Sequence, residues 1–330
     1  MNNNELKLQL VQNYIKEKEN KLSENTSLIL NTISCILGGF MQFDFKYIKL
    51  FYSENYSTNT LCFYRYIFSL LFNYIIIYYT ESYKKQKKFI ELIEYKWIWI
   101  RGIAQFLVFQ TFLFMLEYFR TSTCSCWTSM APISILILST FFLKEKFYMR
   151  YLYGILICFF GVFLMIKNED NNYQGKNNDN NEIIKILKGS FWGFFQLITI
   201  GFKRVSNKKL LKQNILQDDQ LIFSSILNII LAFICSKIRN EYFSFNIIYI
   251  FNCSINGLLW LSFNRLYIIS LKNIALSKTT SIGYISMVTV FILGVIVLNE
   301  KVFISDIIGS LLILGFNVYN SLYPIKENQS

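Results

Sequence analysis

Residues 97–118 of the chain read WIWIRGIAQFLVFQTFLFMLEY, an apolar run whose only charged side chains are Arg101 and Glu117. A helix needs about 20 mostly apolar residues to cross the hydrocarbon core of a bilayer. This run meets that length, and it lacks the alternation of polar and apolar residues that membrane β-strands require. It predicts a transmembrane helix, and it is the pattern with which the rest of the chain is compared.

The same pattern recurs through the 330 residues, of which 53% are hydrophobic and 16% are charged. A soluble domain carries roughly a quarter charged residues. We therefore predict an all-α integral membrane protein with ten transmembrane helices. They lie at 27–46, 58–80, 97–118, 122–143, 147–166, 187–205, 218–236, 246–270, 275–298 and 304–323. The polar residues 1–26 and 324–330 form the predicted tails.

The basic residues predict the orientation of these spans. With a cytosolic N-terminus, and with basic residues near a span end counted with the adjoining segment, 20 of the 33 Lys and Arg residues fall on inner segments, Lys203 and Arg204 among them. Ten fall on outer segments, and Arg65, Arg101 and Arg265 lie within spans. Cytoplasmic loops carry an excess of Lys and Arg, so this distribution places both termini in the cytosol. It also accounts for the formal net charge of +12 without a nucleic-acid partner.

The composition excludes several kinds of chemistry. The chain has no His, which removes the usual general base and the commonest metal ligand. Its seven Cys residues lie mostly inside apolar runs with no CxxC spacing, so we expect neither a metal site nor a disulfide framework. The phosphate-binding pattern GxxxxGK[ST] is also missing. We expect no cofactor, and we expect the protein not to be an enzyme.

The two halves of the chain resemble each other. Shifted by 155 residues, 99–154 align with 254–309 without a gap, and a shift of 154 aligns the start of each half. Because each half holds five spans, the second half enters the membrane upside down, as in many transporters. We predict one five-helix repeat over 27–166, an Asn-rich linker loop over 167–186 and a second repeat over 187–323. The matched pairs are Gly102 with Gly257, Ser122 with Ser277, Leu143 with Leu298, Glu145 with Glu300, Lys146 with Lys301, Gly154 with Gly309, Gly39 with Gly193 and Gln42 with Gln196.

Several short motifs then point to a known family. They are Ile100-Arg101-Gly102, Ala131-Pro132, Phe142-Leu143-Lys144-Glu145-Lys146, and Leu298-Asn299-Glu300-Lys301. With five plus five spans, they resemble the drug/metabolite transporter superfamily, in its EamA-like branch, and the Arg-Gly pair is most similar to solute-carrier-35-type proteins. The second half departs from the pattern, since Met287 stands where Pro132 predicts a proline. The resemblance implies a central cavity lined by both halves and transport by alternating access.

Arg265 is the predicted centre of the solute site. A charge inside the membrane usually faces the bundle interior or a water-filled cavity, so Arg265 is a candidate anchor for an anionic or carbonyl-rich solute. The alternative is an Arg that extends to the inner headgroups. Its repeat partner is Gln110, and Asn264 precedes it.

Four further residues complete the predicted binding set. Gln42 and Gln196 occupy matching places in the two halves, where they would bind a polar solute from two sides or join helices to each other. Trp127 and Tyr284 are aromatic side chains within spans that could stack on a flat ring, although packing explains them equally well.

The charged pairs Glu145-Lys146 and Glu300-Lys301 end spans at opposite faces of the membrane. They are candidate gates, whose ion pairs form and break during transport, or they are interfacial anchors. Gly189 and Gly193, four residues apart, are expected to mark a close helix contact.

The function predicted from these features is transmembrane transport of a small metabolite, possibly an anion, by uniport or exchange. Asp44 and Glu117 fall at predicted span ends, so no central carboxylate suggests coupling to protons or sodium. One alternative is a nucleotide-sugar exchanger, and another is a membrane-embedded transferase enzyme. The expected partners are the solute and the lipid bilayer of the plasma membrane or an endomembrane, and a homodimer is compatible with the sequence.

Overall fold

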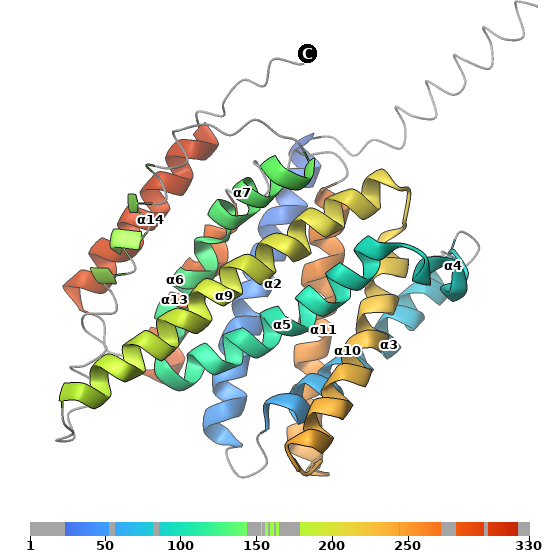
Figure 1. Ribbon diagram of the computed structural model, residues 1–330, viewed down its shortest axis with the longest axis horizontal. Coiled ribbons are helices and arrows are strands. Elements are labelled where there is room, and N and C mark those ends of the chain that lie inside the picture. The colour runs from blue at the N-terminus through green and yellow to red at the C-terminus, as the bar shows by residue number, and fades with distance from the viewer. Residues whose placement is uncertain are drawn as a thin grey trace, which may run out of the picture.

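The computed structural model is a bundle of tilted helices (Figure 1). It describes residues 24–52, 57–81, 86–143, 153, 156, 157, 159–161, 163, 164, 179–243, 245–271, 282–299 and 303–322, and no strand occurs among them. The helices are α2 (Glu24–Phe51), α3 (Thr58–Tyr79), α4 (Phe89–Ile93), α5 (Lys96–Tyr118), α6 (Thr121–Ser129), α7 (Ala131–Leu143), α9 (Asp179–Lys212), α10 (Gln217–Ile238), α11 (Ile247–Ser270), α13 (Tyr284–Leu298) and α14 (Ile304–Leu322).

Six helical segments among the described residues are long and apolar enough to cross a membrane. They are Asn25–Phe51, Thr58–Tyr79, Lys96–Tyr118, Thr121–Leu143, Gln217–Ile238 and Ile247–Ser270, and two shorter apolar helices cover Ile285–Leu298 and Ile304–Phe316. Of the other predicted spans, 147–166 lies mostly outside the described residues, and 187–205 falls within the 34-residue helix α9. An all-helical protein with multiple apolar helices is therefore confirmed.

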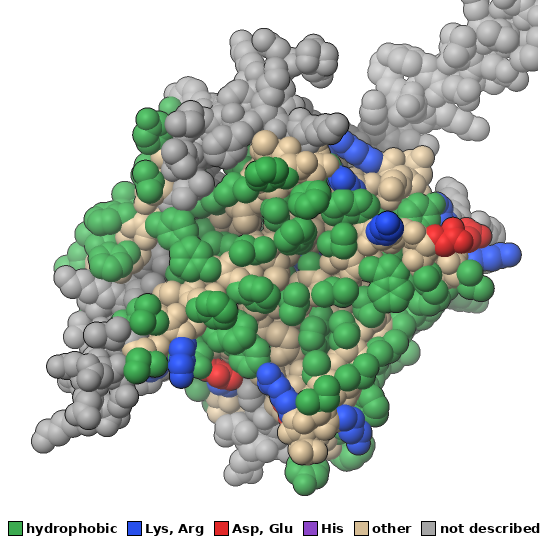
Figure 2. All heavy atoms as spheres, in the orientation of Figure 1, with side chains coloured by type: hydrophobic (Ala, Val, Ile, Leu, Met, Phe, Trp, Pro, Cys, Tyr) green, Lys and Arg blue, Asp and Glu red, His purple; other side chains and the backbone are tan. Residues whose placement is uncertain are grey.

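The outer surface of the bundle carries many exposed hydrophobic side chains, including Phe141, Ile247 and Ile296, each more than two-thirds exposed. On the face shown in Figure 2, hydrophobic side chains cover the middle, and charged side chains gather toward the upper right and lower edges. A soluble protein rarely exposes a contiguous apolar surface of this size. A bilayer that contacts the middle of the bundle accounts for the pattern.

Three predicted helix boundaries differ from the structure. Helix α2 continues to Phe51 instead of ending at 46, so Asp44 lies within a candidate span and accepts a hydrogen bond of 2.7 Å from Asn256 Nδ2. Helix α9 begins at Asp179, inside the predicted linker loop. In α2 the apolar run itself is longer than predicted, since residues 47–51 contain one charged side chain, Lys49. In α9 the helix begins among polar residues, because a helix satisfies its own backbone wherever it leaves the apolar region.

The third difference is a break in the predicted span 122–143. Helix α6 ends at Ser129 and α7 begins at Ala131, directly before Pro132. A proline has no backbone N–H to donate to the carbonyl four residues earlier, which here belongs to Thr128. Proline is tolerated in the first turn of a new helix, so the chain divides at this point into two shorter helices.

The helices of the first half of the chain pack against those of the second half. The largest interfaces join α5 to α9 and α11 to α2, followed by α10 with α3, α13 with α2, α11 with α3, α7 with α9, and α10 with α5. Two glycines allow especially close approach. A Cβ on Gly39 would lie 2.6 Å from Thr289 Cβ of α13, and a Cβ on Gly193 would lie 2.6 Å from Trp127 Cδ2 of α6. The prediction that Gly193 serves helix packing is therefore confirmed.

Candidate functional site: a cationic cavity at the centre of the bundle

A cavity lies where α2, α3, α5, α6, α7, α9, α11 and the start of α13 meet. About 120 Å³ of it is open to the centre of a water molecule. A single water needs roughly 10–15 Å³ by this measure, so the cavity has room for several waters or one small solute. Its described lining includes three cations, three glutamines and six aromatic side chains, and it includes no Asp or Glu.

Arg65 of α3 is the most buried of the three cations, with 1% of the residue exposed. Its guanidinium carbon lies 4.6 Å from the ring centre of Phe109, 4.9 Å from that of Phe45 and 5.6 Å from that of Trp260. Such contacts stabilise a cation through the negative face of each ring.

The aromatic rings leave the hydrogen-bonding capacity of Arg65 largely unused. Its Nη2 donates to Met41 Sδ at 3.3 Å, but Nε and Nη1 have no hydrogen-bond partner. An unsatisfied N–H of a charged group is costly to bury, and a carboxylate or phosphate can accept two N–H bonds from one guanidinium. The wall of the cavity at Arg65 is therefore suited to an anion.

Lys203 and Arg204 of α9 are the other two cations of the lining. Lys203 is 4% exposed, its Nζ lies 5.7 Å from the ring centre of Phe263, and it makes no ion pair with a described residue. The guanidinium of Arg204 stacks 3.4 Å above the ring centre of Tyr267, and its Nη1 has no hydrogen-bond partner. These two charges meet aromatic rings, and no carboxylate of the described lining balances them.

The three glutamines of the lining are Gln42, Gln105 and Gln196. The side-chain oxygen of each has no hydrogen-bond partner. Gln105 Nε2 donates to Tyr66 Oη at 3.0 Å, and Gln196 Nε2 donates to Thr128 Oγ1 at 3.4 Å. The amides of Gln105 and Gln196 are thus oriented by one bond each, and all three glutamines keep an acceptor oxygen for the hydroxyl or amine of a solute.

The break between α6 and α7 also borders the cavity, since Thr128, Ser129, Ala131 and Pro132 are lining residues. Binding sites of membrane carriers are often built where a helix is discontinuous, because the interrupted backbone offers polar groups at membrane depth.

Two of the predicted site residues line this cavity and others do not. Gln42 and Gln196 are in the lining, and their role in binding a solute stays a prediction. Asn264 is fully buried nearby, and its Nδ2 donates to the Trp260 carbonyl at 2.8 Å, one turn earlier in the same helix. Trp127 is also buried, and it packs against Gly193 and the ring of Phe194.

Arg265, the predicted anchor, is not among the lining residues. Its Nη2 lies 3.2 Å from Asp218 Oδ1 at the start of α10, and its Nη1 donates to Asn73 Oδ1 at 3.2 Å. Each partner is almost fully buried. Arg265 therefore joins α11 to α3 and α10, and a role in binding the solute stays a prediction.

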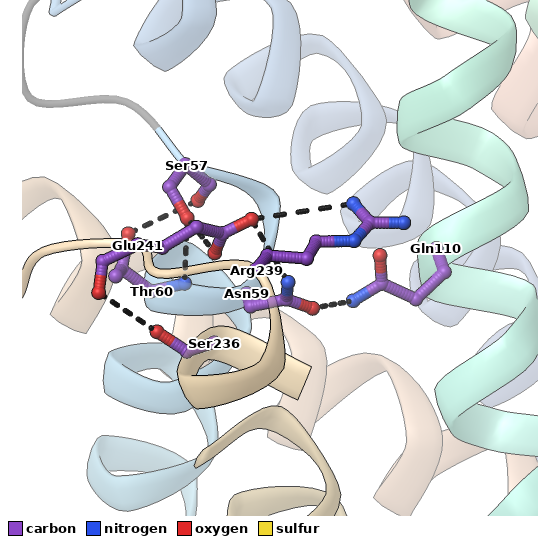
Figure 3. Close-up of polar contacts among 7 residues, drawn as sticks. All are labelled: Ser57, Asn59, Thr60, Gln110, Ser236, Arg239 and Glu241. Carbon is purple, nitrogen blue, oxygen red and sulfur yellow. Dashed lines mark hydrogen bonds and ion pairs between the residues drawn. The ribbon is translucent and has the colours of Figure 1, made fainter. Parts of the chain in front are cut away.

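Gln110, the repeat partner of Arg265, also lies outside the central cavity (Figure 3). Its Nε2 donates to Asn59 Oδ1 at 2.9 Å, and Asn59 Nδ2 donates to Glu241 Oε1 at 3.0 Å. Glu241 also accepts from the Ser57 hydroxyl and lies 4.0 Å from Arg239 Nη1. Gln110 and Arg265 thus make similar contacts between helices. Gln110 binds Asn59 in the first turn of α3, and Arg265 binds Asp218 in the first turn of α10.

The remaining predicted residues cannot be placed. Glu145, Lys146, Glu300 and Lys301 lie outside the described residues, so their gating role stays a prediction. The side chain of Tyr284 is likewise outside them, although α13 begins at this residue.

Sequence reasoning missed all three cations of the lining and one of its three glutamines: Arg65, Lys203, Arg204 and Gln105. Arg65 carried a visible signal, because it was one of three arginines within predicted spans. Lys203 and Arg204 were counted as basic residues of an inner segment, whereas Lys203 is buried in α9. Hydropathy alone could not show that these side chains face a common cavity.

The fold and its surface define an integral, multi-pass helical membrane protein, with a cationic cavity enclosed by helices from both halves of the chain. The sequence model of the EamA-like transporter family matches residues 27–167. The resemblance to that family is thereby confirmed over the first half of the chain, and the family is one of membrane transporters. The narrower likeness to solute-carrier-35-type proteins stays a prediction.

A solved structure supports the fold over nearly the whole chain. It is described only as "Crystal structure of protein", and it shares 12% sequence identity with this chain at a TM-score of 0.64. The likeness covers 90% of this chain and 98% of that one. At this identity it shows a common fold and carries no information about the solute. No curated protein matches the chain.

Proposed function

We propose that the protein carries a small anionic solute across a membrane by alternating access, as a uniporter or an exchanger. The observation that carries this proposal is the cavity lining, in which Arg65, Lys203 and Arg204 face one space and no described lining residue is acidic. Cations inside a membrane protein usually face a partner or a water-filled path. Here an anionic solute supplies the missing partner.

The lining also supports two inverted five-helix repeats, and with them ten spans. Pairs of lining residues are related by the shift of 155 that aligns the halves: Gln105 and Trp260, Val108 and Phe263, Phe112 and Tyr267, Thr128 and Gly283, Ala131 and Ser286. Gln42 and Gln196 are related by the shift of 154. The helix contacts are related in the same way. When each helix is replaced by its counterpart in the other half, the pair α5 and α9 becomes α11 and α2, and the pair α7 and α9 becomes α13 and α2. Two halves that contribute equivalent residues to one cavity are the arrangement that alternating access requires.

The size of the cavity favours a small metabolite over the alternative of a nucleotide sugar. Pockets for drug-sized ligands measure about 300–1,000 Å³. The cavity, at about 120 Å³, is well below that range. We further propose that both termini are cytosolic, on the basis of the distribution of Lys and Arg.

Uptake into proteoliposomes tests the proposal. The purified protein is reconstituted, and radiolabelled solutes are compared in pairs of equal size that differ in charge, such as a carboxylate and its amide. We expect saturable uptake of at least one anion and much slower uptake of its neutral counterpart. Saturable uptake confined to neutral or cationic solutes would show that the cationic lining does not select the solute.

A further inference from the structure

We propose that the solute carries two separate anionic groups, one bound at Arg65 and the other at Lys203 and Arg204. This inference rests on the proposed transport of an anion through the central cavity, and it specifies the class of that anion. Small dicarboxylates and phosphorylated carboxylic acids share this chemistry.

The cations occupy two levels of the cavity, as their contacts along α2 show. At one level, Arg65 lies over Phe45 and binds Met41. At the other level lies Phe263, the ring next to both Lys203 and Arg204. Phe263 contacts α2 at Ser34, whose hydroxyl donates to the Phe263 carbonyl, and at Gly38, where an added Cβ would lie 3.1 Å from the ring. The two levels are centred about seven residues apart on α2, which corresponds to about 10 Å along a helix.

Helix α11 gives the same separation independently. Trp260 faces Arg65, and Tyr267 lies beneath Arg204. These two rings are again seven residues, and therefore about 10 Å, apart along the helix. A charge-assisted contact takes roughly 3 Å at each end. Two anionic groups roughly 4–10 Å apart would therefore reach both levels.

Polar groups of the lining can bind the body of such a solute near Arg65. Gln42 lies on α2 between Met41 and Phe45, the two residues that mark the level of Arg65, and its side-chain oxygen is without a partner. Gln105 lies beside Arg65 through Tyr66, and Gln196 lies two turns before Lys203. Their free oxygens can accept from hydroxyl groups on a short chain. Arg65 has the carboxylate of Asp44 in its electrostatic neighbourhood, whereas the charges around Lys203 are those of Arg204, Arg101 and Arg65. A single anionic centre bound at Arg65 would therefore leave Lys203 and Arg204 unbalanced, which is costly away from water.

Another explanation is that Lys203 and Arg204 only attract anions to the entrance of the cavity. Long-range attraction depends on net charge and falls with ionic strength, and it does not depend on the contacts of one side chain. It predicts that removal of an exposed charge from the same helix has a similar effect. Lys212, the exposed last residue of α9, supplies this matched control.

The test is a binding series on the purified full-length protein at fixed, near-physiological ionic strength. Succinate, succinamate and succinamide have the same length and carry two, one and no charges. Like succinate, adipate and 3-phosphoglycerate are two-ended anions, with one charged group at each end of the molecule. Inorganic phosphate carries its charge at a single centre. Binding is followed as the ligand-dependent rise in the midpoint of thermal unfolding, because a ligand that binds only the folded protein stabilises it.

We expect at least one two-ended anion to bind the wild type about tenfold or more tightly than succinamate and phosphate do, which is the usual scale for one charge-assisted hydrogen bond. Arg204→Gln should remove most of this preference and leave the affinity for succinamate nearly unchanged. Arg204→Lys should restore part of it, and Lys212→Gln should preserve it. If Arg204→Gln does not fold, Lys203→Gln provides the same comparison.

Equal binding of two-ended and one-ended anions by the wild type would overturn the inference while leaving anion transport intact. An equal loss of preference in Lys212→Gln and Arg204→Gln would overturn it in favour of attraction at the entrance. If no anion binds or enters proteoliposomes, the proposed function itself fails.

Discussion

The ion pair between Arg265 and Asp218 allows a sharp prediction, because it separates a structural role from solute binding. The side chain of Asp218 is 2% exposed and that of Arg265 is 14% exposed. Removal of one partner from a buried pair leaves an uncompensated charge and costs about 3–5 kcal/mol. Arg265→Gln should therefore lower the stability of the protein. At about 1.4 °C per kcal/mol for a chain of this length, the midpoint of thermal unfolding should fall by roughly 4–7 °C.

The double variant Arg265→Gln/Asp218→Asn should recover most of the lost stability, since two neutral amides leave no buried charge unpaired. Arg239→Gln is the matched control. Its ion pair with Glu241 spans 4.0 Å and its side chain is 50% exposed, so it should change stability by at most about 1 kcal/mol.

The assay combines thermal unfolding in detergent with uptake normalised to the folded fraction. Because Arg265 lies outside the cavity lining, each folded molecule of Arg265→Gln should transport at nearly the wild-type rate. Loss of uptake in a variant of normal stability would refute this reasoning and support Arg265 as the solute anchor. In that case Arg265→Lys should retain part of the activity, because the charge remains without the planar fork.

Three further predictions concern packing, topology and coupling. Gly193→Ala should destabilise the protein by about 1–3 kcal/mol, since its Cβ would overlap Trp127, whereas Gly315→Ala in α14 meets no atom within 4 Å and should be neutral or stabilising by thermal unfolding. Protease protection in sealed vesicles should find tags at residues 2 and 330 on the cytosolic side and a tag near 175 on the opposite side, and termini on opposite sides would exclude ten spans. Uptake should persist after proton and sodium gradients are collapsed, because Asp44 is outside the described cavity lining and bonded to Asn256; complete loss on addition of an uncoupler would contradict this.

Hydropathy located the ends of several helices closely. The predicted spans 58–80 and 97–118 correspond to α3 and α5, and 246–270 corresponds to α11, each to within one residue at either end. These runs are bordered by polar segments, so composition alone marks where the apolar environment ends. It failed for α2, whose apolar run extends to Phe51, and for α9, which begins in the polar linker because the backbone has no reason to change conformation there.

The site was predictable only where symmetry provided information. Gln42 and Gln196 were identified because they match across the two halves, and both line the cavity. Arg65 is positioned by rings from α2, α5 and α11, which are distant from it in sequence. A hydropathy pattern shows that an arginine lies within a span, but it does not show which neighbours surround it.

The measurement that tests the central claim most directly is uptake of the best transported anion by Arg65→Gln. Arg65→Gln removes the buried cation of the cavity, and Arg239→Gln removes an exposed cation outside it. Uptake is normalised to folded protein in proteoliposomes. We predict that Arg65→Gln raises the apparent KM by about 10–100-fold, or abolishes uptake, since a hydrogen bond to a charged group contributes about 1.5–3 kcal/mol. Arg239→Gln should remain near wild type, and wild-type kinetics in Arg65→Gln would contradict an anion path through this cavity.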